Sequence, residues 1–143
     1  MRIETMPIGA GHGRDKDVDL VVAGRVRMPD LLILGEELAA VLLASERSTI
    51  TQEMPAPLLV VEVVSPGKAN EDRDYRFKRS EYAVRGIPEY WIVDSARQAV
   101  AVLSLVDGLY ESVDYTGSQR LVSGVLPDLD LTVEQILRAG SPA

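Results

Sequence analysis

Two acidic residues beside or within strongly apolar stretches are the residues of this sequence best suited to chemistry. Asp30 follows a proline at the start of the apolar stretch 31–34, and Glu62 lies inside the apolar stretch 58–64. Burying a carboxylate costs free energy unless a partner compensates its charge. A hard divalent cation bound by oxygen ligands is the simplest such partner. Together with Lys78, the two acids predict metal-dependent cleavage of a phosphodiester.

Lys78 is the basic residue that we expect to serve the acidic pair. Side chains alternate along a strand, so Val64 occupies the position beside Glu62 where a strand lysine would stand. The amine must therefore come from another element. Tyr75, Lys78 and Tyr82 share one stripe of a predicted helix, and packing of the two tyrosines toward the sheet would carry the amine inward.

Each of these residues also has an ordinary structural interpretation. Asp30 could end an edge strand, and Lys78 could pair with Asp74 one turn earlier on a solvated helix face. Lys68 is a rival for the role of the lysine, because it is closer to Glu62 in the sequence. Glu62 is the hardest of the three candidates to explain in this way, since apolar residues flank it on both sides.

The elements predicted around these residues alternate between strands and helices. Apolar patterns predict strands over 18–34 or 25–34, 58–64, 90–93, 100–105, 109–115 and 120–123. Helical composition predicts helices over 36–44, 71–85 and 132–140. Asn70 would cap the second helix and Gly86 would end it, and Thr132 with Gln135 forms a capping box for the third. Asp107-Gly108 and Thr116-Gly117 mark turns. This order predicts a mixed α/β domain with an antiparallel C-terminal part.

The composition is that of an ordinary globular domain of 143 residues, 46% hydrophobic and 26% charged. The absence of cysteine excludes disulfides, thiolate catalysis and cysteine zinc sites. No apolar run approaches the roughly 18 to 20 residues that span a bilayer, and no signal-peptide pattern opens the chain, so we expect a cytoplasmic protein. We expect residues 1–20 to be a flexible N-terminal segment and residues 21–143 to form the folded domain.

The net charge of −7 is unusual for a protein that would act on DNA, because nucleic-acid binders are commonly basic. The segment 64–93 is the exception, with six basic and five acidic residues. The balance counts against tight, non-specific DNA binding by a monomer. A homodimer would bring two of these segments together into a basic cleft, and two copies of a one-site enzyme are the simplest way to cut both strands of a duplex.

Four further features have structural interpretations. The glycines of 9–13 suggest a phosphate loop, but no strand precedes them and no helix follows, so no organic cofactor is predicted there. His12 is the only histidine, which excludes a histidine-rich metal site. Ser65 lacks the glycine-flanked turn and the histidine partner of a hydrolase triad, and Trp91 is expected in the core.

The order of these motifs resembles the Uma-two family of restriction-type endonucleases, in the PD-(D/E)XK nuclease superfamily. The resemblance covers about residues 20 to 140, and the combined pattern is far more specific than any single motif. The matching segments are 28–31, 59–66, 78–82, 86–94 and 126–129.

The resemblance implies a restriction-endonuclease-like mixed sheet flanked by helices, with an antiparallel C-terminal extension. It implies that Asp30 and Glu62 are metal-binding acids and that Lys78 is the catalytic lysine, moved from the strand to a helix. Mg²⁺ would be the expected metal, with Mn²⁺ as an alternative. Family members usually carry a longer part before the proline-aspartate pair than the 24 or so residues that precede Arg25 here.

The leading hypothesis is therefore a magnesium-dependent endonuclease that hydrolyses DNA. Asp30, Glu62 and the backbone carbonyl of Val63 would hold the metal, and Lys78 would orient water or stabilise the transition state. Two alternatives remain open. One is a catalytically inactive, N-terminally shortened relative that serves as a binding or assembly module, and the other is a hydrolase of a small phosphate ester.

Overall fold

The computed structural model of the chain describes residues 4–5, 18–22, 25–44, 49–64 and 73–139. Its strands are β1 Glu4–Thr5, β2 Asp19–Val22, β3 Arg25–Arg27, β4 Leu31–Leu34, β5 Thr49–Ile50, β6 Leu59–Val63, β7 Glu89–Asp94, β8 Ala99–Val106 and β9 Leu109–Thr116. Its helices are α1 Glu36–Ala44, the π-helical turn η1 Arg73–Phe77, α3 Lys78–Arg85 and α4 Val133–Ala139. The predicted mixture of strands and helices is confirmed.

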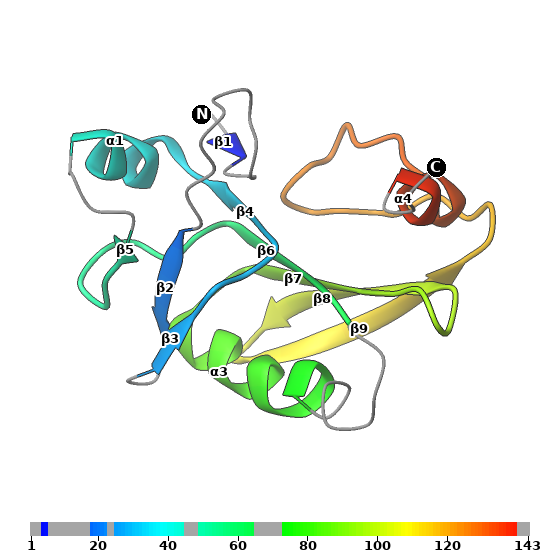
Figure 1. Ribbon diagram of the computed structural model, residues 1–143, viewed down its shortest axis with the longest axis horizontal. Helices are drawn as coiled ribbons and strands as arrows, with labels where there is room; N and C mark the ends of the chain where they lie inside the picture. The colour runs from blue at the N-terminus through cyan, green and yellow to red at the C-terminus, as the bar shows by residue number, and fades with distance from the viewer. Residues whose placement is uncertain (1–3, 6–17, 23–24, 45–48, 65–72, 140–143) are drawn as a thin grey trace.

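The strands form two sheets (Figure 1). A six-stranded sheet has the order β1-β4-β6-β7-β8-β9, and a three-stranded sheet has the order β3-β2-β5. In the large sheet β6 and β7 run parallel and every other pair is antiparallel, including the predicted C-terminal pair β8 and β9. The crossover between the parallel strands contains α3, as a parallel connection requires.

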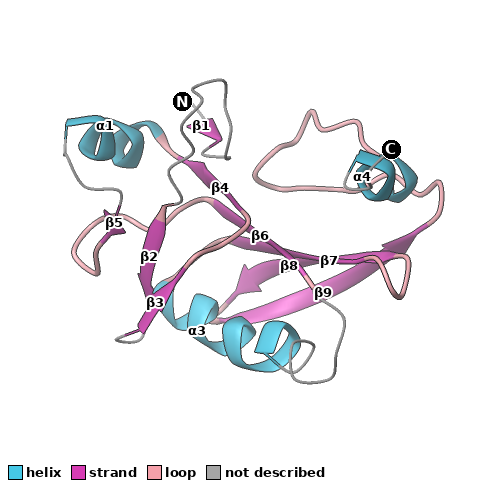
Figure 2. Ribbon diagram, in the orientation of Figure 1, coloured by secondary structure: helices cyan, strands magenta, loops and turns pink. Residues whose placement is uncertain are grey.

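The large sheet is covered on both faces, with α3 on one side and α4 with the C-terminal loop on the other (Figure 2). Alternation along β6 and β7 produces the two cores. Val60 and Ile92 belong to the core that contains Tyr82 of α3, whereas Val61 and Trp91 belong to the core that Val133 of α4 closes. The expectation that Trp91 is a core residue is confirmed, since its side chain is 6% exposed.

Several predicted elements match the structure closely. The helix 36–44 has the predicted bounds, and β6, β8 and β9 agree with prediction to within about one residue. Gly86 ends α3 in the left-handed region, at φ +83°, where its missing Cβ avoids strain. The capping box is formed as predicted: the hydroxyl of Thr132 accepts from the Gln135 amide, and the Gln135 side chain accepts from the Thr132 amide.

Two predicted strands were wrong. The stretch 18–34 is not one strand but three. β2 and β3 are antiparallel partners, and Pro29 interrupts the ladder after β3, where the chain passes from the small sheet to the large one. The predicted strand 120–123 is absent from the described residues, where only Arg120 forms an isolated bridge, to Thr132. Around Ser123, side-chain and backbone donors bond the Glu89 carboxylate in place of a strand partner.

The predicted helix 71–85 begins differently from expectation within its described part. Its first described turn is π-helical, over Arg73–Phe77, and the α-helix starts at Lys78. At the other end, Arg85 donates to the backbone carbonyls of Val21, Thr51 and Met54, which fixes the end of α3 to the small sheet and its neighbouring loop.

Several predictions fall on residues outside the described part of the chain, namely Asn70, the glycines of 9–13, His12, Lys68 and Ser65. Glu4 and Thr5 of the predicted N-terminal segment pair with β4. None of the described helices is long and apolar enough to cross a membrane.

Candidate active site

Glu62 occupies the centre of the candidate site. It is 3% exposed, on β6, and the alternation of that strand turns it toward α3. Its Oε1 lies 3.0 Å from Nζ of Lys78, and its Oε2 accepts a hydrogen bond of 2.5 Å from the hydroxyl of Tyr82. Two donors from one helix therefore hold the two oxygens of a carboxylate that the sheet buries.

Burial raises the pKa of Glu62 above its ordinary value, because desolvation disfavours the charged form. The amine of Lys78 and the hydroxyl of Tyr82 act in the opposite direction, and the nearby negative charge of Asp30 raises the pKa further. The same surroundings raise the pKa of Tyr82, first through burial and then through the Glu62 charge. Tyr82 therefore remains a neutral hydroxyl that donates to Glu62.

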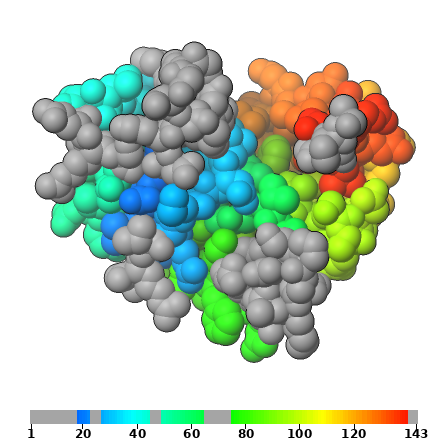
Figure 3. Space-filling model, in the orientation of Figure 1, coloured from blue at the N-terminus to red at the C-terminus, as the bar shows by residue number. Residues whose placement is uncertain are grey.

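Asp30 lies in the bend between β3 and β4, directly after the proline that ends the first strand. Its Oδ2 accepts a hydrogen bond of 2.7 Å from the backbone N–H of Val63, the residue that follows Glu62. In the space-filling view the β3–β4 segment and the end of β6 adjoin on the visible surface (Figure 3). The side chain of Asp30 is exposed, so this acid is open to a ligand.

One interpretation of the sequence placed Lys78 on a solvated face of the helix, and the structure shows that it is not there. Its side chain is only 13% exposed, because the first turn of α3 directs it at the sheet and at Glu62. The side chain of Asp74 lies outside the described residues. The predicted stripe is present, since Tyr75 also faces the sheet and donates a hydrogen bond of 2.9 Å to Asp94.

The contact between Tyr75 and Asp94 lies next to the cluster around Glu62. Asp94 is 2% exposed at the end of β7, and it also accepts from the backbone N–H of Arg97. Burial, together with the Asp94 carboxylate, raises the pKa of Tyr75 to about 12. Tyr75 therefore contacts an acid other than Glu62, and Asp94 is a buried acid that the sequence analysis did not select.

Arg27 and Glu81 are two further residues that the sequence analysis missed. Nε and Nη2 of Arg27 each donate a hydrogen bond of 2.8 Å to a different oxygen of Glu81. The pair connects β3 to α3, and the charge of Glu62 contributes to the raised pKa of Arg27 after the larger effect of Glu81. The sequence held one indication of this pair, because Arg27 is a charged residue within a predicted strand, three positions before Asp30.

The donors brought together here suit a hard cation. Asp30 and Glu62 offer carboxylate oxygens, and Val63 adds a backbone carbonyl at the end of β6. Mg²⁺ commonly binds one or two protein carboxylates and keeps several waters, so a two-acid set is sufficient for it. Within the described ranges no group of three or more histidine, cysteine, aspartate or glutamate residues could hold a metal ion. A site here would thus depend on water or substrate oxygens for its remaining ligands.

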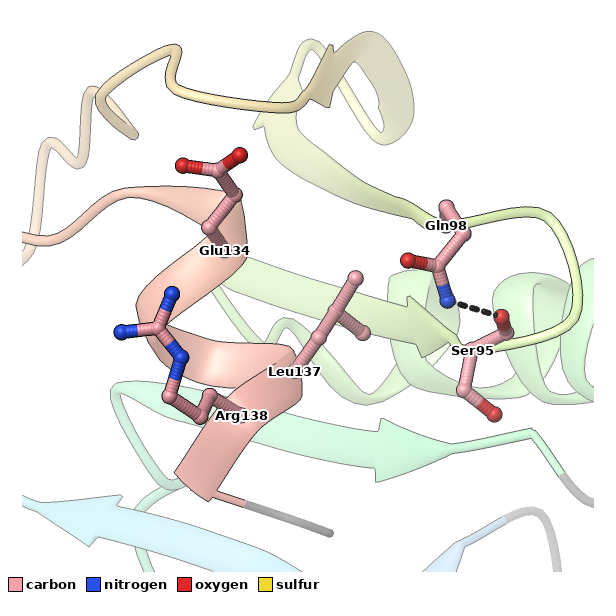
Figure 4. A pocket seen from close by; sticks show the side chains of 5 residues that line it. All are labelled: Ser95, Gln98, Glu134, Leu137 and Arg138. Carbon is pink, nitrogen blue, oxygen red and sulfur yellow. Dashed lines mark hydrogen bonds between the residues drawn. The ribbon is translucent and has the colours of Figure 1, made fainter.

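A separate cleft of about 290 Å³ lies between the β7–β8 turn and α4 (Figure 4). Gln98 closes one side through a 2.6 Å hydrogen bond from its side-chain amide to the backbone carbonyl of Ser95. The lining residues are Ser95, Gln98, Glu134, Leu137 and Arg138. The cleft contains neither Asp30 nor Glu62, so it is not the candidate site.

The structure thus joins Asp30 and Lys78, from the β3–β4 bend and from α3, to neighbouring residues at the end of β6. The chain belongs to the Uma2 family, whose description is "Putative restriction endonuclease" and whose family model matches residues 6–134. The predicted family resemblance is therefore confirmed. Among curated proteins, none matches the chain.

A solved structure supports the fold. The chain is similar to a protein from Anabaena variabilis described as "a putative nuclease belonging to DUF820", with a TM-score of 0.64 and 12% sequence identity. The similarity covers 95% of this chain and 68% of that chain. Identity this low shows a shared fold alone, and it confirms the predicted arrangement of a mixed sheet with flanking helices.

Proposed function

We propose that the chain is a Mg²⁺-dependent endonuclease that hydrolyses phosphodiester bonds of DNA. The observation that carries the proposal is the buried contact of 3.0 Å between Glu62 and Lys78, beside the exposed carboxylate of Asp30. Membership of the Uma2 family supports a nuclease-type function. A buried acid with a lysine partner and a second acid nearby is an arrangement suited to a scissile phosphate and its metal.

Each residue has a distinct role in this proposal. Asp30, Glu62 and the carbonyl of Val63 would hold Mg²⁺, or Mn²⁺ as an alternative. The bound cation would supply Lewis acidity at the phosphate and lower the pKa of water. Lys78, fixed by α3, would place its positive charge beside the phosphoryl oxygens that gain charge in the transition state. Tyr82 would keep Glu62 in one orientation by donating to Oε2, and Tyr75 would fix the start of the helix on Asp94.

The proposed function also suggests a homodimer and a cytoplasmic location. A homodimer would combine two segments 64–93, the part of an otherwise acidic chain in which basic residues outnumber acidic ones. Such a pair would offer DNA a basic cleft that one copy lacks, and it would place one site near each strand. We propose a cytoplasmic location, in keeping with the absence of cysteine.

A second candidate function is a catalytically inactive relative that binds or assembles. The observation that favours it is the lack, among the described residues, of any group of three potential metal ligands of the histidine, cysteine and acid type. A site with two acids would hold the cation more weakly than one with three, because fewer charged ligands compensate its loss of water. Without a bound cation the buried Glu62 would have a purely structural role.

Cleavage of supercoiled plasmid with Mg²⁺, with Mn²⁺ and with a chelator separates the two candidates. An endonuclease nicks or linearises the plasmid only with the metal, and Glu62→Gln abolishes this activity. An inactive relative leaves the plasmid intact at every metal concentration, although it can still retard DNA in a gel. Sedimentation of the same sample tests the homodimer, which a strictly monomeric chain would contradict.

A further inference from the structure

Three polar contacts connect the three segments that carry the candidate residues. The carboxylate of Asp30 accepts from the Val63 amide at 2.7 Å, and Glu62 contacts Lys78 at 3.0 Å. These two contacts join the β3–β4 bend to β6 and β6 to α3. A third contact is required to join α3 back to the bend.

The Arg27–Glu81 pair supplies that third contact. Arg27 lies three residues before Asp30, and Glu81 lies three residues after Lys78, so each member is about one short step from a candidate residue. The two hydrogen bonds, both 2.8 Å, have the bidentate geometry in which a guanidinium fixes direction as well as distance. The contacts therefore form a closed ring of bend, strand and helix.

We propose that Arg27 is a positioning residue, which through Glu81 sets where Lys78 lies relative to Asp30. The inference rests on the proposed function, because it concerns the geometry of that same site. Nε and Nη2 of Arg27 both donate to Glu81, so the contact that the structure shows is with α3, and the proposed action on the site passes through that helix.

The surroundings of the pair make this role more effective than that of a surface ion pair. The side chains of Arg27 and Glu81 are 16% and 13% exposed, so solvent screens their attraction only in part. β3 belongs to the small sheet, whereas Glu62 belongs to the large one. Arg85 fixes the far end of α3 independently. The Arg27 pair thus controls the half of the helix that carries Lys78.

The first test separates turnover from binding in DNA cleavage. Arg27→Met should lower kcat by about 10- to 100-fold and leave KM within about twofold, because a displacement of the order of an ångström at a catalytic group is costly. Glu81→Gln should behave in the same way, and Arg27→Lys should lie between Arg27→Met and the wild type. The double reversal Arg27→Glu with Glu81→Arg should recover part of the lost kcat.

Arg120→Met is the matched control, since Arg120 also forms an ion pair, with Asp130, but the two side chains are 65% and 76% exposed. It should leave kcat unchanged. Three outcomes would overturn the proposal: an Arg27→Met variant with wild-type kcat, an effect on KM alone, or a loss in Arg27→Met that Glu81→Gln does not share. The last two would make Arg27 a substrate contact.

A second readout does not depend on cleavage. Hydrogen exchange of the Val63 amide, measured without metal, reports the Asp30 contact on the far side of the ring. It should be faster in Arg27→Met, recover in part in the reversed pair and stay unchanged in Arg120→Met. Unchanged exchange in Arg27→Met would refute the positioning role. If the wild type cuts no DNA under any metal condition, the proposed function fails, whereas this exchange measurement still decides the coupling.

Discussion

Glu62 and Glu89 are buried carboxylates on neighbouring strands of one sheet, yet their surroundings differ in kind. Their exposed fractions are 3% and 2%. Glu62 faces α3 and is held by an ammonium and a hydroxyl. Glu89 faces the opposite side. Among the described residues its donors are neutral groups, namely the indole of Trp91, the hydroxyl of Ser123 and the backbone amides of Gly124 and Val125.

The difference shows that burial alone does not identify a functional acid. Every described donor to Glu89 is part of the sheet or of the loop that packs on it, so this carboxylate fixes the loop to the sheet. Glu62 combines a cationic partner with a second acid, and its raised pKa records an environment that a bound cation would relieve. We therefore expect substitutions at the two positions to affect different quantities.

Glu62→Gln is expected to have the largest effect on activity. The amide keeps the size of the side chain but removes the charge that would hold Mg²⁺, so cleavage should fall by about 10³-fold or more. Calorimetric titration with Mg²⁺ should show binding in the wild type and none in this variant. Glu89→Gln serves as the control and should bind the metal normally. Equal magnesium binding by wild type and Glu62→Gln would remove the proposed site.

Lys78→Ala should lower the single-turnover cleavage rate by about 10²- to 10³-fold, because its charge is needed most in the transition state. The affinity for DNA should change little, because the amine that is lost is mostly buried and is only one of the positive charges of the segment 64–93. Arg138→Ala removes a cation on α4, away from the candidate site, and this variant should cut at the wild-type rate. A Lys78→Ala variant that cuts as fast as the wild type would contradict this role and make Lys68 the candidate for the catalytic lysine.

Glu89→Ala should lower the stability of the fold and leave catalysis normal, the opposite of what we expect for Lys78→Ala. Removing the acceptor leaves buried donors without a partner, which costs about 2 to 4 kcal/mol of unfolding free energy. Urea denaturation measures this loss, and cleavage per folded molecule should match the wild type. A Glu89→Ala variant that is as stable as the wild type would show that the loop does not depend on this carboxylate.

The smallest expected effect is a pH dependence of the metal-free protein. The pKa of Glu62 is raised above its ordinary value of 4.5, so the folded chain binds this proton more tightly than the unfolded chain. The resulting stability is complete below the ordinary pKa and is lost as pH rises through the raised one. Denaturation at a series of pH values, with a chelator present, should show this loss in the wild type and not in Glu62→Gln. Parallel curves for the two proteins would contradict the assignment.

Local sequence patterns predicted the elements around the site well. The helix 36–44 and the strand around Glu62 follow from composition and apolar run length, and Gly86 follows from its place after a helix. The stripe that carries Lys78 and Tyr82 follows from helical spacing, and the structure directs both toward the same carboxylate. These features depend on neighbours in the sequence, which a pattern can record.

Features that depend on distant partners were not predictable in this way. Arg27 and Glu81 are 54 positions apart, so no local pattern connects them. The apolar alternation near Leu121 suggested a strand. In the structure the backbone N–H of Gly124 instead donates to the carboxylate of Glu89, 35 positions earlier in the chain. The role of Glu89 was hidden for the same reason, because all of its described donors except the indole of Trp91 lie 34 to 36 positions later in the chain.

The number of residues in the π-helical turn Arg73–Phe77 determines how Tyr75 and Lys78 are oriented relative to each other. Such a turn holds one residue more than an α-helical turn. Here it contains Tyr75, which contacts Asp94, and it ends directly before Lys78, which contacts Glu62. Deleting one residue would restore α-helical winding and rotate Tyr75 by roughly 100° relative to Lys78. The lysine would keep its acid while the tyrosine lost its own. Insertions and deletions at this turn can therefore uncouple the two contacts without changing any of the four side chains.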